Sequence, residues 1–270
     1  MGDPQVTHRE VTRVAGAALE RGQDAIAVER ALEIRVGGRP LSVTLRTPGH
    51  DTELAVGFLA GEGLIGAAAD VLAARETAAE CADQPDVIEL TLAPTVRMDW
   101  TRLERHFAAT AACGLCGRAH LESLRAGLTP MAASAPFAAT ALAGLAARVR
   151  EAQAAFAATG GLHAAAWCDE TLAPRVVRED VGRHNAVDKV AGWLVAAGRY
   201  PAGAGLLWVS GRAGAEIVLK AARARMPALA AVGAPSSLAV ELAAAAGMTL
   251  IGFLREGRMN VYSGIERLSA

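Results

Sequence analysis

The chain contains 270 residues, enough for one large domain or two smaller ones, and 52% of them are hydrophobic, which is ample for a filled core. The formal net charge is −1 and the pI is about 6.6. This balance excludes a global basic surface, so neither nucleic acid nor an anionic membrane is an expected partner.

Three features indicate where the protein works. The first 20 residues mix charged side chains into their apolar residues and lack the apolar core of a signal peptide. The longest apolar run, residues 243–254, is too short to span a membrane. Four cysteines in a chain of this length do not form a disulfide framework. We therefore expect a cytoplasmic protein.

The N-terminal part of the chain predicts an α+β region. Apolar and polar residues alternate over 24–46 around a Gly-Gly-Arg-Pro turn, which predicts a β-hairpin. A helix is expected over 52–64. A strand at 87–92 and a short amphipathic helix at 100–110 then lead to a cysteine-containing loop.

The remainder of the chain predicts an α/β region. An alanine-rich helix is expected over 141–159, closed by Gly160 and Gly161. Beyond residue 205, runs of strand length alternate with helical patterns, which is typical of a parallel sheet. Glu216 and Lys220 have the spacing of a stabilising helical ion pair. The expected order is strand 206–209, helix 213–225, strand 228–232, helix 237–246 and strand 248–253.

The most informative feature is a Cys-Gly-Leu-Cys-Gly segment, which places thiols at Cys113 and Cys116 among small residues. Thiolates are the nucleophilic and metal-ligating form of cysteine, and a glycine-rich setting lets either sulfur approach another molecule. The pair therefore indicates sulfur chemistry or metal binding. Cys81 and Cys168 stand alone and are interpreted as packing residues.

Loops at the carboxyl ends of the predicted parallel strands indicate a ligand site. In an open parallel sheet, ligands bind where such loops lead into helix N-termini. Arg212, Arg255 and Arg258 lie in these loops and could clamp a phosphate or a guanine edge. Each loop alone fits an ordinary turn, and the three together favour a ligand. The loops span residues 210–214, 234–237 and 253–258.

The segment 179–190 concentrates ionisable and amide side chains before an apolar helix. Asn185 and Asp188 resemble a capping box, and Lys189 is expected to be solvated. Capping does not explain the other polar residues, which could position a ligand, pair with each other or assist proton transfer. They are Asp180, Arg183 and His184.

A zinc site is the competing interpretation of the thiol pair, with His120 or His163 as a further ligand. His120-Leu-Glu superficially resembles the His-x-Glu of zinc deaminases. The order is wrong, because the cysteines precede the histidine, and no glutamate follows His163 at the required position. His163 also fits an ordinary histidine at the start of an apolar strand.

Taken together, these segments resemble the formate dehydrogenase accessory sulfurtransferases, the FdhD family, over nearly the whole chain. The matching motifs occur in the family's order. They are Arg30-Ala-Leu-Glu-Ile-Arg-Val-Gly-Gly, Thr47-Pro-Gly-His-Asp, Leu54-Ala-Val-Gly-Phe-Leu-Ala-Gly-Glu-Gly, Cys113-Gly-Leu-Cys-Gly, Thr159-Gly-Gly-Leu-His-Ala-Ala, Glu179-Asp-Val-Gly-Arg-His-Asn-Ala-Val-Asp-Lys, Ser210-Gly-Arg and Gly252-Phe-Leu-Arg.

The resemblance implies an α/β fold and a homodimer. The larger C-terminal α/β/α domain would be similar to the cytidine deaminase fold, without its zinc site, and the smaller N-terminal domain would be α+β. We expect the N-terminal domain over 1–112, a flexible loop and linker over 113–128, and the deaminase-like domain over 129–270.

The resemblance also implies a reaction. The family takes persulfide sulfur from a cysteine desulfurase and passes it to the molybdenum or tungsten bis(guanine dinucleotide) cofactor of formate dehydrogenase. Cys113 would carry the persulfide, and Cys116 would relay or resolve it. The expected cofactor-binding residues are Phe253, Leu254, Arg255, Glu256, Gly257, Arg258, Ser210, Gly211, Arg212, Asp180, Arg183, His184 and Asn185.

The sequence is compatible with two other interpretations of the protein's function. One is a non-catalytic carrier that binds the molybdenum cofactor and delivers it to formate dehydrogenase without using either thiol. The other is a zinc hydrolase, although our expectation is that the protein holds no metal of its own. Ala213 and Gly214 also depart from the family pattern, which often has bulkier or hydroxyl residues there, so the ligand contacts of the 210–214 loop are the least secure inference.

Overall fold

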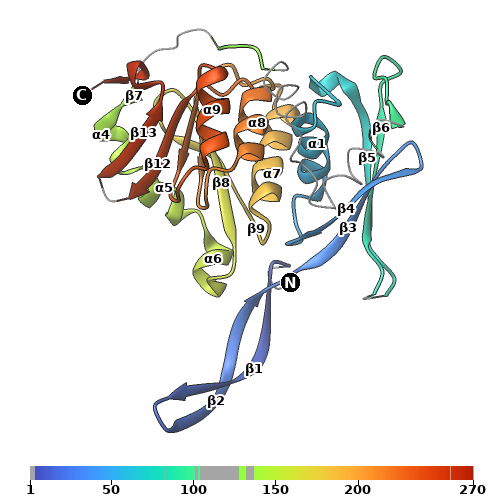
Figure 1. Ribbon diagram of the computed structural model, residues 1–270. Coiled ribbons are helices and arrows are strands. Elements are labelled where there is room, and N and C mark those ends of the chain that lie inside the picture. Colours follow the sequence, from blue (N-terminus) through green and yellow to red (C-terminus); the bar gives the residue numbers. More distant parts are fainter. Residues whose placement is uncertain are drawn as a thin grey trace.

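The computed structural model describes residues 4–81, 83–100, 103, 128–131, 137–255 and 257–269. Two sheets with helices against them form most of this part of the chain, and a two-stranded ribbon projects from it (Figure 1). The ribbon consists of β1 (Val6–Ala15) and β2 (Ala18–Ala27). The sequence did not predict it, and assigned residues 24–27 instead to the following hairpin.

The N-terminal sheet has four strands, and α1 (Asp51–Gly61) packs on one of its faces. Alternate residues such as Leu32 and Ile34 face this helix and are each 1% exposed, which confirms the predicted period of two. The predicted hairpin and the strand near residue 87 are likewise confirmed. In spatial order the strands are β4 (Arg39–Arg46), β3 (Arg30–Val36), β6 (Asp86–Leu92) and β5 (Val71–Thr77), and the 3-10 helix η1 (Ala68–Asp70) precedes β5.

The larger sheet has six strands, of which β10, β11 and β12 are parallel neighbours. The predicted strand–helix alternation after residue 205 is therefore confirmed, and His163 begins β8. In spatial order the strands are β13 (Arg258–Ser263), β12 (Thr249–Arg255), β11 (Ala228–Ala231), β10 (Leu206–Val209), β8 (His163–Cys168) and β9 (Pro174–Asp180). A separate short pair joins β7 (Phe137–Ala138) and β14 (Leu268–Ser269), and the 3-10 helix η2 (Ile265–Arg267) precedes β14.

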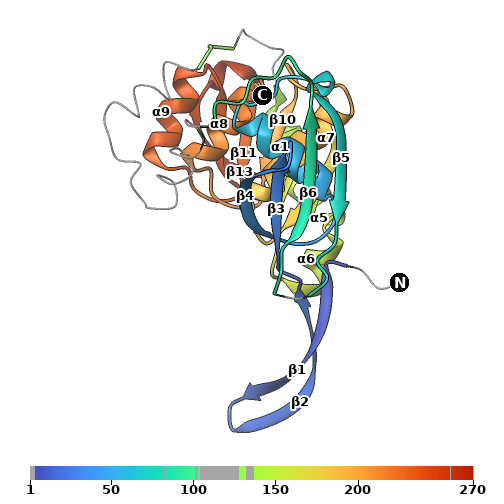
Figure 2. The ribbon, with the colours of Figure 1, turned by 90° about the vertical axis from the view of Figure 1, so that its right-hand side faces the viewer.

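Helices cover both faces of the larger sheet and give three layers (Figures 1 and 2). The predicted helix over 141–159 is three short helices, because turns interrupt it at Gly144 and again at residues 152–153. One face carries α7 (Arg183–Ala196), α8 (Ala215–Arg223) and α9 (Ser237–Ala245), and the other carries α4 (Ala139–Ala143), α5 (Leu145–Glu151) and α6 (Ala154–Thr159).

A close crossing of α1 and α7 joins the two sheet regions (Figure 1). Gly57 and Gly192 form the contact. A methyl group at Gly57 would lie 1.7 Å from the backbone oxygen of Asp188, and one at Gly192 would lie 1.9 Å from the backbone oxygen of Glu53. Only glycine lets the two helix backbones approach this closely.

Both lysines of the chain are buried, which corrects two expectations. Lys189 is not solvated, because its ammonium group lies 2.8 Å from the carboxylate of Asp180, and both side chains are fully buried. Lys220 does not bond Glu216, because it donates to both carboxylate oxygens of Asp188, at 2.7 and 2.9 Å. The N-cap of α7 is Gly182, so the predicted capping box is also wrong.

The two isolated cysteines differ in their surroundings. Cys168 is fully buried, as predicted, and burial raises the pKa of its thiol to about 12. Cys81 is exposed, so the expectation that it packs in the core is wrong. Cys113, Cys116 and His120 lie outside the described residues, as does most of the predicted helix 100–110. Among the helices in the described ranges, none is long and apolar enough to cross a membrane.

Candidate functional site

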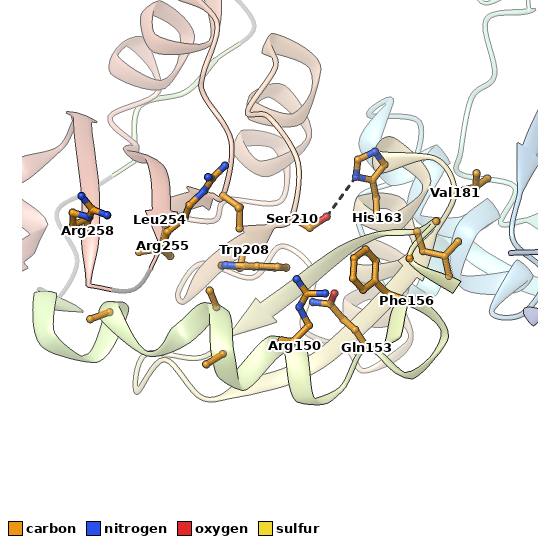
Figure 3. Close-up of a pocket in the computed structure, with 17 residues that line it drawn as sticks. Arg150, Gln153, Phe156, His163, Val181, Trp208, Ser210, Leu254, Arg255 and Arg258 are labelled. Atoms are coloured by element: carbon orange, nitrogen blue, oxygen red, sulfur yellow. Dashed lines mark hydrogen bonds between the residues drawn. The ribbon is translucent and has the colours of Figure 1, made fainter. Parts of the chain in front are cut away.

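A cavity of about 1030 Å³ lies beyond the carboxyl ends of β10, β11 and β12, on the side covered by α4, α5 and α6 (Figure 3). This is the position at which open parallel sheets bind ligands. Ser210 follows β10, Val232 follows β11, and Leu254 and Arg255 close β12. Helices α4, α5 and α6 form the opposite wall of the cavity.

One residue that lines this cavity carries a buried polar atom without a hydrogen-bond partner. Trp208 is 2% exposed, and its indole nitrogen Nε1 has no hydrogen-bond partner within the part of the chain that is described. Gln153, on the facing wall, is 3% exposed. Buried polar groups are normally bonded, because leaving one unpaired costs free energy. The indole N–H of Trp208 is therefore a candidate donor to a ligand.

Arginines supply positive charge to the same cavity. Arg255 and Arg258 are cross-strand partners in the β12–β13 hairpin, and neither forms an ion pair with a described residue. Like charges placed opposite each other destabilise a hairpin, so the arrangement favours an anion between or beside them. The guanidinium of Arg150 lies 4.3 Å from the centre of the Phe156 ring, which stacks a third cation on an aromatic face.

A histidine and a serine form the inner end of the cavity (Figure 3). His163 Nδ1 lies 3.5 Å from the hydroxyl of Ser210, which accepts a hydrogen bond from the backbone N–H of Ala164 at 2.9 Å. Burial lowers the pKa of His163, and the positive charge of Arg183 lowers it further. The ring is therefore neutral at neutral pH and can donate or accept one proton.

The predicted ligand residues divide between the cavity and its surroundings. Among those that the structure describes, four line the cavity: Ser210, Leu254, Arg255 and Arg258. Gly211 and Arg183 lie beside His163, since a methyl group at Gly211 would lie 3.5 Å from the histidine ring and 3.9 Å from Arg183.

The other described residues of the 210–214 and 253–258 loops are not among those that line the cavity. Arg212 is exposed beside Gly233. Phe253 is 41% exposed, with a φ of 54°, and its N–H bonds Gly233. Gly257 has a φ of 79°, which suits glycine at the hairpin turn, and Glu256 lies outside the described residues.

Asp180 and Asn185 belong to a bonded network next to the cavity. One carboxylate oxygen of Asp180 accepts hydrogen bonds from Gly182 N–H and Asn185 Nδ2, and the other contacts Lys189 and accepts from Thr47 N–H. Asn185 also donates to the backbone oxygen of Leu45. These atoms connect α7 to the N-terminal sheet.

His184 faces α8, and its Nε2 lies 3.5 Å from a carboxylate oxygen of Glu216. Burial is the main reason why the pKa of His184 is lowered.

Several of the lining side chains were not predicted from the sequence. Trp208 lies two residues before Ser210, and its presence in a four-residue strand was the available signal. Arg150, Gln153 and Phe156 had no recognisable spacing, because the turns that separate α5 from α6 bring them together.

Comparisons with known proteins cover almost the whole chain. Residues 27–269 match the family described as FdhD/NarQ. A protein of Nocardia farcinica named "Sulfur carrier protein FdhD" is 49% identical over 265 residues, covering 96% of this chain and 94% of its own. A protein of the same name from Mycobacterium tuberculosis is 45% identical, covering 97% and 98%.

A solved structure shows the same fold. It is a protein from Desulfotalea psychrophila described as a formate dehydrogenase accessory protein, with a TM-score of 0.79 and 21% sequence identity. The match covers 98% of this chain and all of the other.

Proposed function

Since the chain belongs to the FdhD/NarQ family, we propose that it is a sulfur carrier that accepts sulfur as a persulfide and delivers it to the molybdenum cofactor of formate dehydrogenase. The names of its relatives support the carrier role. The thiol pair of Cys113 and Cys116 supplies the chemistry that a persulfide carrier needs. The protein would act in the cytoplasm, before the cofactor enters the dehydrogenase.

The observation that carries the proposal is the cavity beyond the parallel strands. Its size of about 1030 Å³ exceeds what a single side chain or small ion would need. It combines arginines that lack ion-pair partners among the described residues with an unpaired indole N–H and a buried carboxamide. This combination suits a large ligand that carries both phosphates and polar aromatic rings, as a guanine dinucleotide arm does.

The structure offers separate groups for each part of such an arm. Arg255 and Arg258 would hold phosphate oxygens, since guanidinium groups bond phosphate in a bidentate manner. Trp208 and Gln153 would bond the polar edge of the base. Arg183 would add positive charge at the start of α7, and Asp180, His184 and Asn185 would support that wall through their bonds to protein groups.

Loading is a thiol exchange in which no net oxidation occurs. The Cys113 thiolate attacks the outer sulfur of a persulfide on the cysteine desulfurase, the S–S bond there breaks, and the desulfurase cysteine leaves as a thiolate. Cys113 then carries the sulfane sulfur.

Release uses the second thiol. The Cys116 thiolate attacks the inner sulfur of the Cys113 persulfide, a disulfide forms between the two cysteines, and the outer sulfur leaves as hydrosulfide towards the cofactor substrate. A dithiol reductant must then supply two electrons and two protons to restore both thiols.

The test is intact-protein mass spectrometry after incubation with an active cysteine desulfurase and cysteine. We expect an added mass of about 32 Da per transferred sulfur, located at Cys113 by peptide mapping after alkylation. If neither loop cysteine gains sulfur, the persulfide proposal is wrong. The cavity would then favour the second candidate, a carrier that binds the cofactor without using its thiols.

The cavity itself can be tested with Trp208→Phe. This change removes the unpaired N–H and keeps an aromatic ring, so we expect guanosine diphosphate to bind about tenfold more weakly in titration calorimetry. The free energy of unfolding should not fall by the amount that a lost hydrogen bond costs, because this N–H has no described partner. Trp193→Phe, outside the cavity, is the matched control, and equal weakening in both variants would contradict the assignment.

A further inference from the structure

The β1–β2 ribbon extends away from the rest of the described chain (Figures 1 and 2). Its strands pair over ten residues each, and no residue of either strand is buried. Val14 and Leu19 face each other across the strands near the tip and are 68% and 72% exposed. Isolated two-stranded ribbons are only marginally stable in water, so an element of this length needs a surface to lie against.

Only the base of the ribbon is held by its own chain. The N–H of Val28 bonds Gln5, and the side chain of Gln5 bonds the backbone oxygen of Pro48. Helix α6 also touches both strands near this end, where Gly161 approaches Ala27. The outer half has no such contact within the described residues.

A second exposed apolar surface lies close to that base, on β4. Val43 and Leu45 are 62% and 57% exposed, and β4 ends two residues before Pro48. They point away from the core, because the alternate positions of β4 pair with the buried Leu32 and Ile34. Strand β4 is also an edge of its sheet. Exposed edge strands with apolar side chains are common sites of association.

We propose that these two surfaces bind each other between two copies of the chain, with the ribbon of each protomer lying across β4 of its partner. One two-fold contact then covers both surfaces in both copies, whereas a different partner would have to recognise each separately. The proposal does not rest on sulfur transfer. It proposes that the β1–β2 ribbon and β4 form the interface of the homodimer that the family resemblance implies.

The dimensions and the charge of the ribbon fit a second copy of the chain as its binding partner. Ten residues extend about 34 Å, and two strands are about 10 Å wide, so two ribbons and their two acceptor surfaces together bury about 1,400 Å², which is typical of a stable interface. The ribbon is neutral, because three arginines balance three carboxylates. A neutral arm does not attract nucleic acid or an anionic membrane. The charged residues are Arg9, Arg13, Arg21, Glu10, Glu20 and Asp24.

The test is sedimentation equilibrium of the full chain and three variants. We expect the wild type to be dimeric, and Leu19→Arg and Leu45→Arg each to raise the dimer dissociation constant at least about tenfold. The matched control is Leu72→Arg, because Leu72 is 61% exposed on the opposite edge strand and should not affect dimerisation. Circular dichroism checks that each variant is folded.

A charge-paired variant separates direct contact from indirect effects. If the ribbon touches β4, Leu19→Glu combined with Leu45→Arg should dimerise more tightly than either single variant. A monomeric wild type would overturn the proposal and would favour a different binding partner for the ribbon and β4. A dimer unaffected by Leu19→Arg and Leu45→Arg would overturn it too, and so would a response to only one of them.

Discussion

Replacing Cys113 with serine should abolish sulfur loading and leave the protein folded. A hydroxyl group cannot hold sulfane sulfur, and the pKa of the buried Cys168 thiol, about 12, keeps that residue protonated at neutral pH and therefore unreactive. The measurement is the added mass of about 32 Da after incubation with a cysteine desulfurase, followed by reactivation of formate dehydrogenase. Both signals should vanish together.

Cys81→Ser is the matched control for this experiment. Cys81 is an exposed thiol outside the Cys-x-x-Cys segment, so its replacement should leave both signals unchanged. Cys116→Ser should still load sulfur at Cys113 and should release it slowly, because the resolving thiol is gone. Normal maturation of formate dehydrogenase by Cys113→Ser would disprove the proposed chemistry and favour a carrier without a persulfide.

Replacing Gly192 with alanine should cause a large loss of stability. The added methyl would lie 1.9 Å from the backbone oxygen of Glu53, and backbone cannot move aside as a flexible side chain can. Helices α1 and α7 would have to separate, together with the two sheet regions that they join. We expect a loss of about 3 kcal/mol in the free energy of unfolding, measured by urea titration.

Gly214→Ala is the comparison for Gly192→Ala. Nothing lies within 4 Å of the position that its methyl would occupy, and its φ of −83° suits any residue. Its stability should stay within about 0.5 kcal/mol of the wild type. Equal losses in the two variants would show that the closeness of the helix crossing is not the cause.

Some of the predicted ligand residues lie together because strand order limits where loops can meet. Runs of apolar residues after residue 205 identified three strands, and the loops after parallel strands must gather at one edge of the sheet. Ser210, Leu254, Arg255 and Arg258 line one cavity for this reason. Asp180 and Asn185 were predicted from charge density alone, which does not distinguish a ligand site from a bonded network joining two parts of the fold.

The ribbon and the burial of the two lysines were not predicted, because neither leaves a pattern within a short segment of sequence. Polar residues in β1 and β2 alternate too weakly to predict a strand, since the ribbon has no buried face. Lys189 was expected to be solvated because lysine is seldom buried without a partner, and Lys220 was expected to pair with Glu216. Their actual partners, Asp180 and Asp188, come from contacts that spacing does not reveal.

The sequence by itself determined the family motifs, the thiol pair, the β3–β4 hairpin and the parallel strands, because these depend on residue type and on periodicity within short segments. Only the tertiary structure decided which polar groups lack partners, how close α1 and α7 approach, and which side chains enclose the cavity. These properties depend on distances between segments far apart in the chain, and such distances follow from packing rather than from local pattern.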